Sequence, residues 1–239
     1  MASQQRPNSL GRSHTAGLRH FNSNVRAHTA NQRMRLSKRA RGEQNARLPF
    51  VPPEDWHEPT GSGSPYKIIV QPPGPGFRHV VTPEEVRARL TQVPARFLES
   101  LEVIQFSRMT RKKQSFPCYG MQWGTSLYLY PIEEGLVEYY SAPPQQDQLN
   151  EARMYGGRWT NPEPGVWTLV WTEAAVKDFY LNNILIHELG HLLDDRNSRS
   201  VDRERYAEWF AVEYGYKRSR KGPEPRKSVR RHHKGKIWE

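Results

Sequence analysis

The segment Ile184–Asp194, with the sequence ILIHELGHLLD, constrains the fold of this 239-residue chain more than any other part of it. Most of its residues are leucine or isoleucine at the spacing of a buried helix, and packing alone does not explain polar side chains in such a helix. His187 and His191 nevertheless stand four residues apart, so their side chains project from one helical face about one turn from each other. We therefore expect a buried helix that presents two imidazoles on the same face.

This pair of histidines has the H-E-x-x-H spacing of a zinc-binding helix. Two imidazoles one turn apart can share a metal ion, whereas Glu188 points about 100° further round the helix, toward a water on the metal. A pattern with three fixed positions also arises by chance, in which case the histidines are satisfied core residues. The helical context, the apolar flanks and a second acidic helix favour a Zn²⁺ site with Glu188 as general base.

Catalytic zinc needs a third protein ligand and an open fourth position. A three-histidine H-E-x-x-H-x-x-G-x-x-H site requires glycine and histidine where this chain has Asp194 and Asn197. The next acidic segment is ERYAEWFA, residues 204–211, in which Glu204 and Glu208 share one helical face. Its alanines leave room for another helix to approach. These residues favour a carboxylate as the third ligand.

Together the two segments resemble the gluzincins, the H-E-x-x-H plus glutamate class of zinc peptidases that includes thermolysin. The chain resembles more closely the minimal members related to repressor-cleaving metallopeptidases of phages and mobile elements. Those proteins carry E-x-x-A-[N/D/E]-x-F-A after the zinc helix, and ERYAEWFA matches that pattern. The resemblance covers roughly residues 150–216 and implies that Glu204 is the third ligand. It also implies that Glu208 is a hydrogen-bond partner of a zinc histidine, or else the alternative ligand.

The activity implied by this resemblance is zinc-dependent hydrolysis of a peptide bond in a protein or peptide substrate. Short helices and the lack of accessory domains suggest a narrow substrate range. Zinc would polarise the scissile carbonyl, and Glu188 would move a proton from water to the leaving amine. A tyrosine often stabilises the oxyanion in such sites. The candidates, among which the sequence does not choose, are Tyr155, Tyr206, Tyr214 and Tyr216.

The ligand assignment predicts a distance between Glu204 and the two histidines, which a structure can test. Glu204 lies 13 residues after His191, which leaves the loop 196–201 to reverse the chain, with Ser200 or Asp202 capping the next helix. Zinc bonds of about 2.0–2.1 Å place neighbouring ligand atoms about 3.3 Å apart. We therefore expect a Glu204 oxygen about 3–4.5 Å from both histidine nitrogens.

The rest of the folded part reads as an α+β domain, zincin-like by the resemblance, with a small mixed sheet, the H-E-x-x-H helix and a following glutamate-bearing helix. Thr82 and Pro83 have the residue types of an N-cap and a first helical position. Helices are expected at about 173–194 and 202–217. Strands are predicted at 101–107, 126–130, 136–140, 153–160 and 166–171, with a hairpin between the second and third of these. The resemblance implies that residues 153–160 are a sheet edge over the cleft, where a peptide could bind as an added strand; the alternative is a plain surface loop.

The net charge of +11 is concentrated at the two ends of the chain. Residues 1–48 and residues 217–236 each contain ten Lys or Arg and one acidic residue, whereas residues 49–216 contain 16 basic and 22 acidic residues. Few apolar residues near the N-terminus predict disorder there. We divide the chain into a disordered basic tail and Pro/Gly linker (1–65), a zincin-like domain (66–216) and a basic tail (217–239).

Two other functions remain open. One alternative is a nucleic-acid-associated protein whose basic tails bind phosphate non-specifically, with the zincin domain as a regulatory or non-hydrolytic zinc-binding module. The simpler explanation of the tails is that they are disordered and only keep the chain soluble. A zinc-binding scaffold would predict loss of the base, and Glu188 is present. A single cysteine, Cys118, excludes an intramolecular disulfide, and no apolar run approaches the roughly 18 residues of a membrane span. We expect a cytoplasmic protein without membrane contact.

Overall fold

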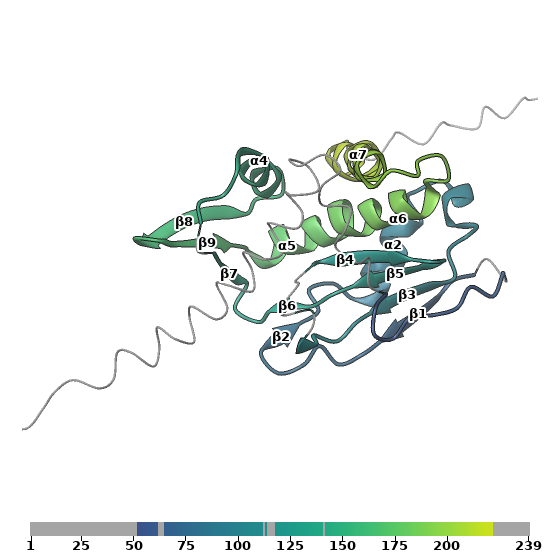
Figure 1. Cartoon of the computed structure of the whole chain (residues 1–239), viewed down its shortest axis with the longest axis horizontal. Coiled ribbons are helices and arrows are strands. Elements are labelled where there is room, and N and C mark those ends of the chain that lie inside the picture. The colour runs from purple at the N-terminus through teal and green to yellow at the C-terminus, as the bar shows by residue number, and fades with distance from the viewer. Residues whose placement is uncertain (1–51, 62–64, 112, 114–117, 141, 222–239) are drawn as a thin grey trace, which may run out of the picture.

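The computed structural model describes residues 52–61, 65–111, 113, 118–140 and 142–221, and these form a mixed α+β structure (Figure 1). The strands are β1 (Lys67–Val70), β2 (Phe77–Arg78), β3 (Val103–Phe106), β4 (Gly120–Trp123), β5 (Ser126–Leu129), β6 (Ile132–Glu133), β7 (Val137–Tyr140), β8 (Arg158–Glu163) and β9 (Val166–Val170). The helices are α2 (Pro83–Leu90), α4 (Gln146–Met154), α5 (Glu173–Phe179), α6 (Leu185–Leu193), α7 (Ser200–Phe210) and α8 (Lys217–Arg220). A 3₁₀ turn, η1 (Ala95–Leu98), and two π-helical segments, η2 (Tyr180–Ile184) and η3 (Ala211–Tyr216), complete the set. Most of the two predicted tails, residues 1–51 and 222–239, lies outside the described residues.

The main sheet has the strand order β1-β3-β5-β4, in which the first three strands are parallel and β4 is an antiparallel edge. Alternate residues of β3 and β5 point to opposite faces. On one face Ile104, Phe106, Leu127 and Leu129 join the hydrophobic core, which also includes residues of α6. Both strands are buried along their whole length because the other face is covered as well.

The segment 52–61 covers that other face. The His57 ring hydrogen-bonds the Gln105 side chain at 2.7 Å, and the His57 backbone N–H donates to the Tyr128 hydroxyl at 3.1 Å. The backbone N–H groups of Thr60 and Gly61 donate to the Glu102 carboxylate at 2.8 and 2.7 Å. Residues that the sequence pattern placed in a linker therefore pack against the sheet.

Helix α2 begins as its sequence predicts. The Thr82 hydroxyl accepts from the Glu85 N–H at 3.2 Å, and the Glu85 carboxylate accepts from the Thr82 N–H at 2.8 Å. This reciprocal capping box follows from the Thr-x-x-Glu spacing. Helix α2 connects the parallel strands β1 and β3, so the domain contains one β-α-β crossover that the predicted order of elements lacked.

The predicted hairpin between residues 126–130 and 136–140 is wrong. Strand β5 pairs with β3 and β4, whereas β7 pairs with β9 in a separate three-stranded sheet of order β7-β9-β8. The connecting residues form β6, which pairs with β2, and Leu136 then adopts a positive φ of 54°. Sequence pattern identifies a strand but not its partner, since pairing depends on distant residues.

The predicted strand 153–160 is also partly wrong. Residues 146–154 form α4, whose start has a capping box between Gln145 and Gln148, and only residues from Arg158 onward pair as β8. Strand β8 is an edge of the smaller sheet. The strand that packs beside α6 is instead β4, which the sequence pattern did not reveal.

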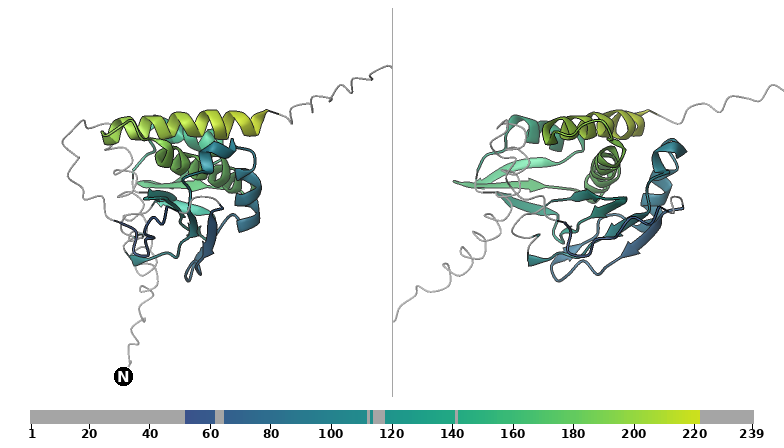
Figure 2. Two further views of the ribbon diagram at one scale, coloured as in Figure 1. Left: turned by 90° about the vertical axis from the view of Figure 1, so that its right-hand side faces the viewer. Right: turned by 45° about the vertical axis from the view of Figure 1, so that its right-hand side comes forward.

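Two long helices dominate the C-terminal half. One runs through α5, η2 and α6, and the other through α7, η3 and α8, which extends past residue 216. The second begins at Ser200 with Arg199 as N-cap, so the predicted caps Ser200 and Asp202 are wrong. Figure 2 shows α7–α8 lying over α6, on the side away from the main sheet. The contact is tight, because a Cβ at Gly215 would lie 1.9 Å from the Asn182 carbonyl oxygen.

Two general properties of the described residues bear on the expectations above. No helix among them is long and apolar enough to cross a membrane.

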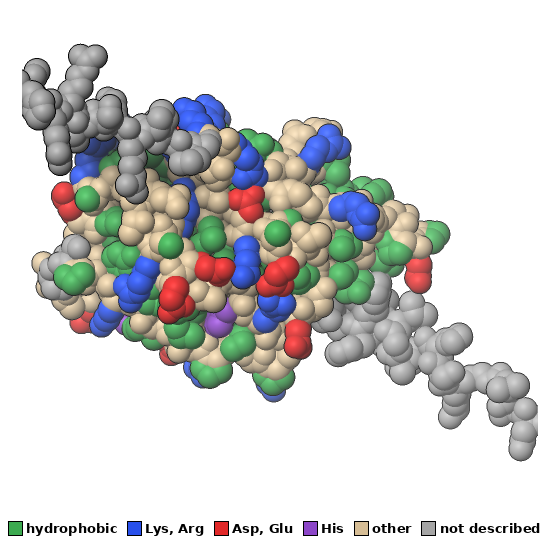
Figure 3. All heavy atoms as spheres, turned by 180° about the vertical axis from the view of Figure 1, so that it is seen from behind, with side chains coloured by type: hydrophobic (Ala, Val, Ile, Leu, Met, Phe, Trp, Pro, Cys, Tyr) green, Lys and Arg blue, Asp and Glu red, His purple; other side chains and the backbone are tan. Residues whose placement is uncertain are grey.

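Acidic and basic side chains are interspersed over the face shown in Figure 3. Residues 49–216 accordingly contain both kinds of charge, 22 acidic and 16 basic residues, whereas the chain ends are strongly basic.

Candidate metal centre

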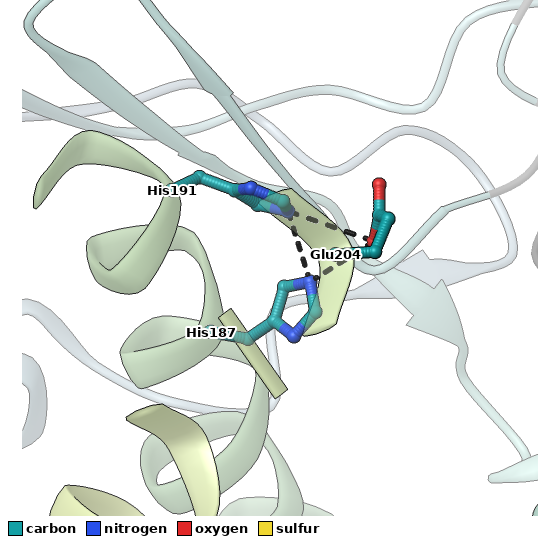
Figure 4. A group of neighbouring side chains, drawn as sticks. All are labelled: His187, His191 and Glu204. Atoms are coloured by element: carbon teal, nitrogen blue, oxygen red, sulfur yellow. Dashed lines mark hydrogen bonds and ion pairs between the residues drawn. The ribbon is translucent and has the colours of Figure 1, made fainter. Parts of the chain in front are cut away.

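Two histidines of α6 and one glutamate of α7 converge on a single point (Figure 4). The Nε2 atoms of His187 and His191 lie 3.1 Å apart. One carboxylate oxygen of Glu204 lies 3.6 Å from the first of these nitrogens and 3.7 Å from the second. Both distances fall within the range expected from the sequence. The three ligand atoms lie within 4.8 Å of one another and form a group that could hold a metal ion.

The turn between α6 and α7 brings Glu204 back to the histidines. The Asp194 carboxylate accepts hydrogen bonds from the Asn197 backbone N–H at 3.2 Å and from its side-chain amide at 2.9 Å. Asp194 is also the C-cap of α6 and is buried. The two residues that exclude a three-histidine site therefore form the turn that makes a glutamate ligand possible.

Small residues set the distance between the two helices. A Cβ at Gly190, inside the H-E-L-G-H motif, would lie 3.0 Å from the Ala207 Cα and 3.1 Å from the Phe210 Cβ. Ala207 and Ala211 are fully buried at this crossing, as the sequence led us to expect. A larger residue at either side would separate α6 from α7 and move Glu204 away from the histidines.

Arg203 joins the two helices of the candidate metal centre to the sheet, and the sequence carried no signal for this role. Its guanidinium donates to the His191 backbone oxygen at 3.1 Å and makes a longer contact of 3.4 Å with the Gln122 side-chain oxygen in β4. Because Arg203 precedes Glu204 directly, these contacts hold the first turns of α7 against the end of α6.

Glu188 is buried, with 6% of its surface exposed, and its side chain lies against the edge strand β4. A Cβ at Gly120 would meet the Glu188 Oε1 and Cγ atoms at 2.9 Å. No hydrogen bond joins this carboxylate to another residue within the described ranges, so it remains available to a water or a substrate. The sequence analysis missed Gly120, although a glycine within a strand often marks such a close approach.

Replacing Gly120 by alanine is expected to destabilise the protein by about 1–3 kcal/mol, the usual cost of overpacking, and to displace Glu188. The added methyl group would also meet Ile184 at 2.7 Å. Denaturant unfolding measures the stability, and zinc titration tests whether the histidine pair still binds. Gly135→Ala is the matched control, because a Cβ there has no atom within 4 Å. Equal stability of the two variants would contradict this close contact.

The structure limits the choice of oxyanion-stabilising group. Tyr155 is buried and donates to the Asn182 backbone oxygen at 3.2 Å, so its hydroxyl is already engaged in the core. Tyr216 packs against Tyr155 at 5.5 Å between ring centroids. Tyr206 follows Glu204 by two residues and therefore points about 200° round the helix from it. Tyr155, Tyr216 and Tyr206 therefore do not face the ligand group. The fourth candidate, Tyr214, packs against Phe97 with 5.0 Å between the ring centroids.

Tyr130, which the sequence analysis did not consider, lies in a small hollow with Glu54, Gln105 and other residues of the sheet face that the segment 52–61 covers. Its hydroxyl is buried and has no hydrogen-bond partner among the described residues. Burial raises the pKa of this phenol far above its ordinary value, and the neighbouring Cys118 and Tyr128 add to the shift. The phenol therefore stays protonated and can act only as a neutral donor or acceptor.

Glu208 is half-buried on α7, one turn beyond Glu204. It does not belong to the group whose ligand atoms converge, which consists of His187, His191 and Glu204. A hydrogen bond from Glu208 to a zinc histidine therefore stays a prediction.

Comparisons with protein-family models, curated proteins and solved structures found no match to this chain. The interpretation of the site therefore rests on its own geometry. That geometry consists of a His-His-Glu triad on two packed helices, with the ligand atoms of His187, His191 and Glu204 facing one another. Such an arrangement is compatible with a zincin-like site.

Proposed function

We propose that this chain is a zinc-dependent peptidase in which His187, His191 and Glu204 hold the metal and Glu188 is the general base. The observation that carries the proposal is the convergence of two imidazole nitrogens and a carboxylate oxygen within 4.8 Å. Two histidines and a glutamate are a donor set of catalytic zinc that leaves a fourth position open. The residues present therefore fit the ion in both chemistry and spacing.

The chemistry at this site divides between the metal and the chain. A bound zinc ion supplies Lewis-acid polarisation of a carbonyl and a lowered pKa for water. Glu188 accepts the proton of the attacking water and returns it to the leaving amine, which completes the cleavage. Close packing against Gly120 restricts the position of this carboxylate, so little reorientation is needed when substrate binds.

The edge strand β4 is the proposed platform for the substrate. It pairs with β5 on one side and ends the strand order of the main sheet on the other, and it packs beside α6. An extended peptide can add to such an edge through backbone hydrogen bonds. This assignment replaces the strand 153–160, because β8 belongs to the smaller sheet.

The test is a cleavage assay on the purified full chain. Loaded with one equivalent of zinc and incubated with peptides derived from a whole proteome, the protein is expected to generate new termini that mass spectrometry detects. A chelator should remove the activity and added zinc should restore it. Stoichiometric zinc binding with no new termini in any peptide would contradict the proposed hydrolysis and favour a zinc-binding scaffold.

A further inference from the structure

The outer face of α7, η3 and α8 contains an open hollow of about 150 Å³. We call this surface the aromatic-basic groove. It is lined by Trp209, Glu213, Tyr214, Lys217, Arg218 and Lys221. Trp209 lies five residues after Glu204, so it points about 140° away from the metal ligand around the helix. The groove and the metal centre thus occupy different faces of the same helix.

Aromatic rings hold Trp209 in place while leaving half of it exposed. Its ring lies 5.6 Å from the Tyr206 ring and 6.3 Å from the Tyr214 ring, nearly perpendicular to the latter. Tyr214 packs in turn on Phe97 and Phe210, which anchors it to the core. Trp209 is 50% exposed and lines the groove beside Tyr214, so its ring is accessible to a ligand there.

Positive charge accumulates at the C-terminal end of this groove. Residues 217–221, KRSRK, include four basic residues and no acidic one. Lys217 pairs with Glu213, and Arg220 turns away from the groove to pair with Asp178 at 2.6 Å. Arg218 and Lys221 are exposed and have no acidic partner within the described ranges. Residues 222–239, which follow in the sequence, add six basic and two acidic residues.

We propose that the aromatic-basic groove binds single-stranded nucleic acid, with a base stacked on Trp209 and phosphates held by Arg218 and Lys221. Exposed aromatic rings beside a track of cations are the recognition elements of single strands. In a duplex the bases stack on each other and their faces are not accessible to an indole. An acidic peptide would satisfy the cations but would leave the exposed indole without an aromatic partner.

Fluorescence anisotropy of the full chain with a labelled oligo-deoxythymidine tests the stacking. Trp209→Ala is expected to weaken binding at least about five-fold, because stacking contributes about 1–3 kcal/mol per base. Trp209→Phe should retain most of the affinity. Trp56→Ala is the matched control, since Trp56 is 46% exposed elsewhere on the protein. Equal affinities for wild type and Trp209→Ala would overturn the proposal.

The salt dependence tests the phosphate contacts. Each neutralised phosphate contributes about 0.7 to the slope of log affinity against log salt for single strands, so Arg218→Ala/Lys221→Ala should reduce the slope by about 1.4. The control pair Arg153→Ala/Arg158→Ala removes two exposed cations from α4 and β8 and should leave the slope unchanged. An equal reduction in both double variants would show a general charge effect and overturn the assignment to the groove.

Two further measurements identify the ligand and its place. Oligonucleotides with 5-bromodeoxyuridine should photo-crosslink to the peptide that contains Trp209. Crosslinks confined to other peptides, or competition by a duplex or by poly-glutamate as strong as that by the unlabelled single strand, would overturn the proposal. Binding should persist with a chelator present, so this result and the outcome of the peptidase assay are independent.

Discussion

Replacing Glu188 by glutamine is expected to lower peptide hydrolysis by about 10²- to 10⁴-fold, the usual contribution of a general base. The amide has nearly the same shape as the carboxylate and fits the same buried space beside Gly120. It has no basic oxygen that can take a proton from water. Because Glu188 is not one of the three converging ligands, zinc binding should be unchanged.

Cleavage rates from the peptide assay and zinc content by elemental analysis measure these two effects on the same preparation. Glu163→Gln makes the same chemical change at an exposed position of β8, so it is the matched control and should have wild-type activity and zinc content. A Glu188→Gln protein that turns over at the wild-type rate would show that another group acts as the base. Loss of zinc together with activity would instead place Glu188 among the ligands.

Removing Glu204 is expected to abolish stoichiometric zinc binding, and removing His187 or His191 should do the same. Each change deletes one of the three proposed protein ligands and leaves an incomplete site. Glu208→Ala should weaken binding only about 10- to 100-fold, as loss of an outer hydrogen-bond partner does. The difference between Glu204→Ala and Glu208→Ala therefore separates the ligand from its proposed partner.

Thermal unfolding with and without zinc provides the measurement. A ligand at about 1,000 times its dissociation constant stabilises the folded state by about 4.1 kcal/mol, so wild type should unfold at a clearly higher temperature when zinc is added. The increase should vanish in Glu204→Ala and shrink in Glu208→Ala. The opposite order would exchange the two assignments. An increase that survives removal of either glutamate and either histidine would refute the metal centre.

The local part of the candidate site was predictable from sequence. The positions of His187 and His191 on one face of a helix follow from the 3.6-residue period, which needs no knowledge of distant residues. Ala207 and Ala211 signalled a close helix crossing, and the Thr82 cap signalled the start of α2. Each of these signals comes from residues within a few positions of each other along the chain, so the helical repeat alone fixes their relative positions.

Only the tertiary structure decided which elements meet. Gly120 and Arg203 gained their roles because β4 lies beside α6, a pairing between segments about 65 residues apart that no local pattern specifies. The aromatic-basic groove likewise depends on how α7 lies over α6, which exposes Trp209 while the neighbouring rings pack inward. Sequence alone determined that His187 and His191 share one helical face with Glu188 beside them, because a helix converts spacing directly into geometry. The edge strand beside α6 and the exposed indole were decided by long-range packing, which depends on contacts that the sequence does not display.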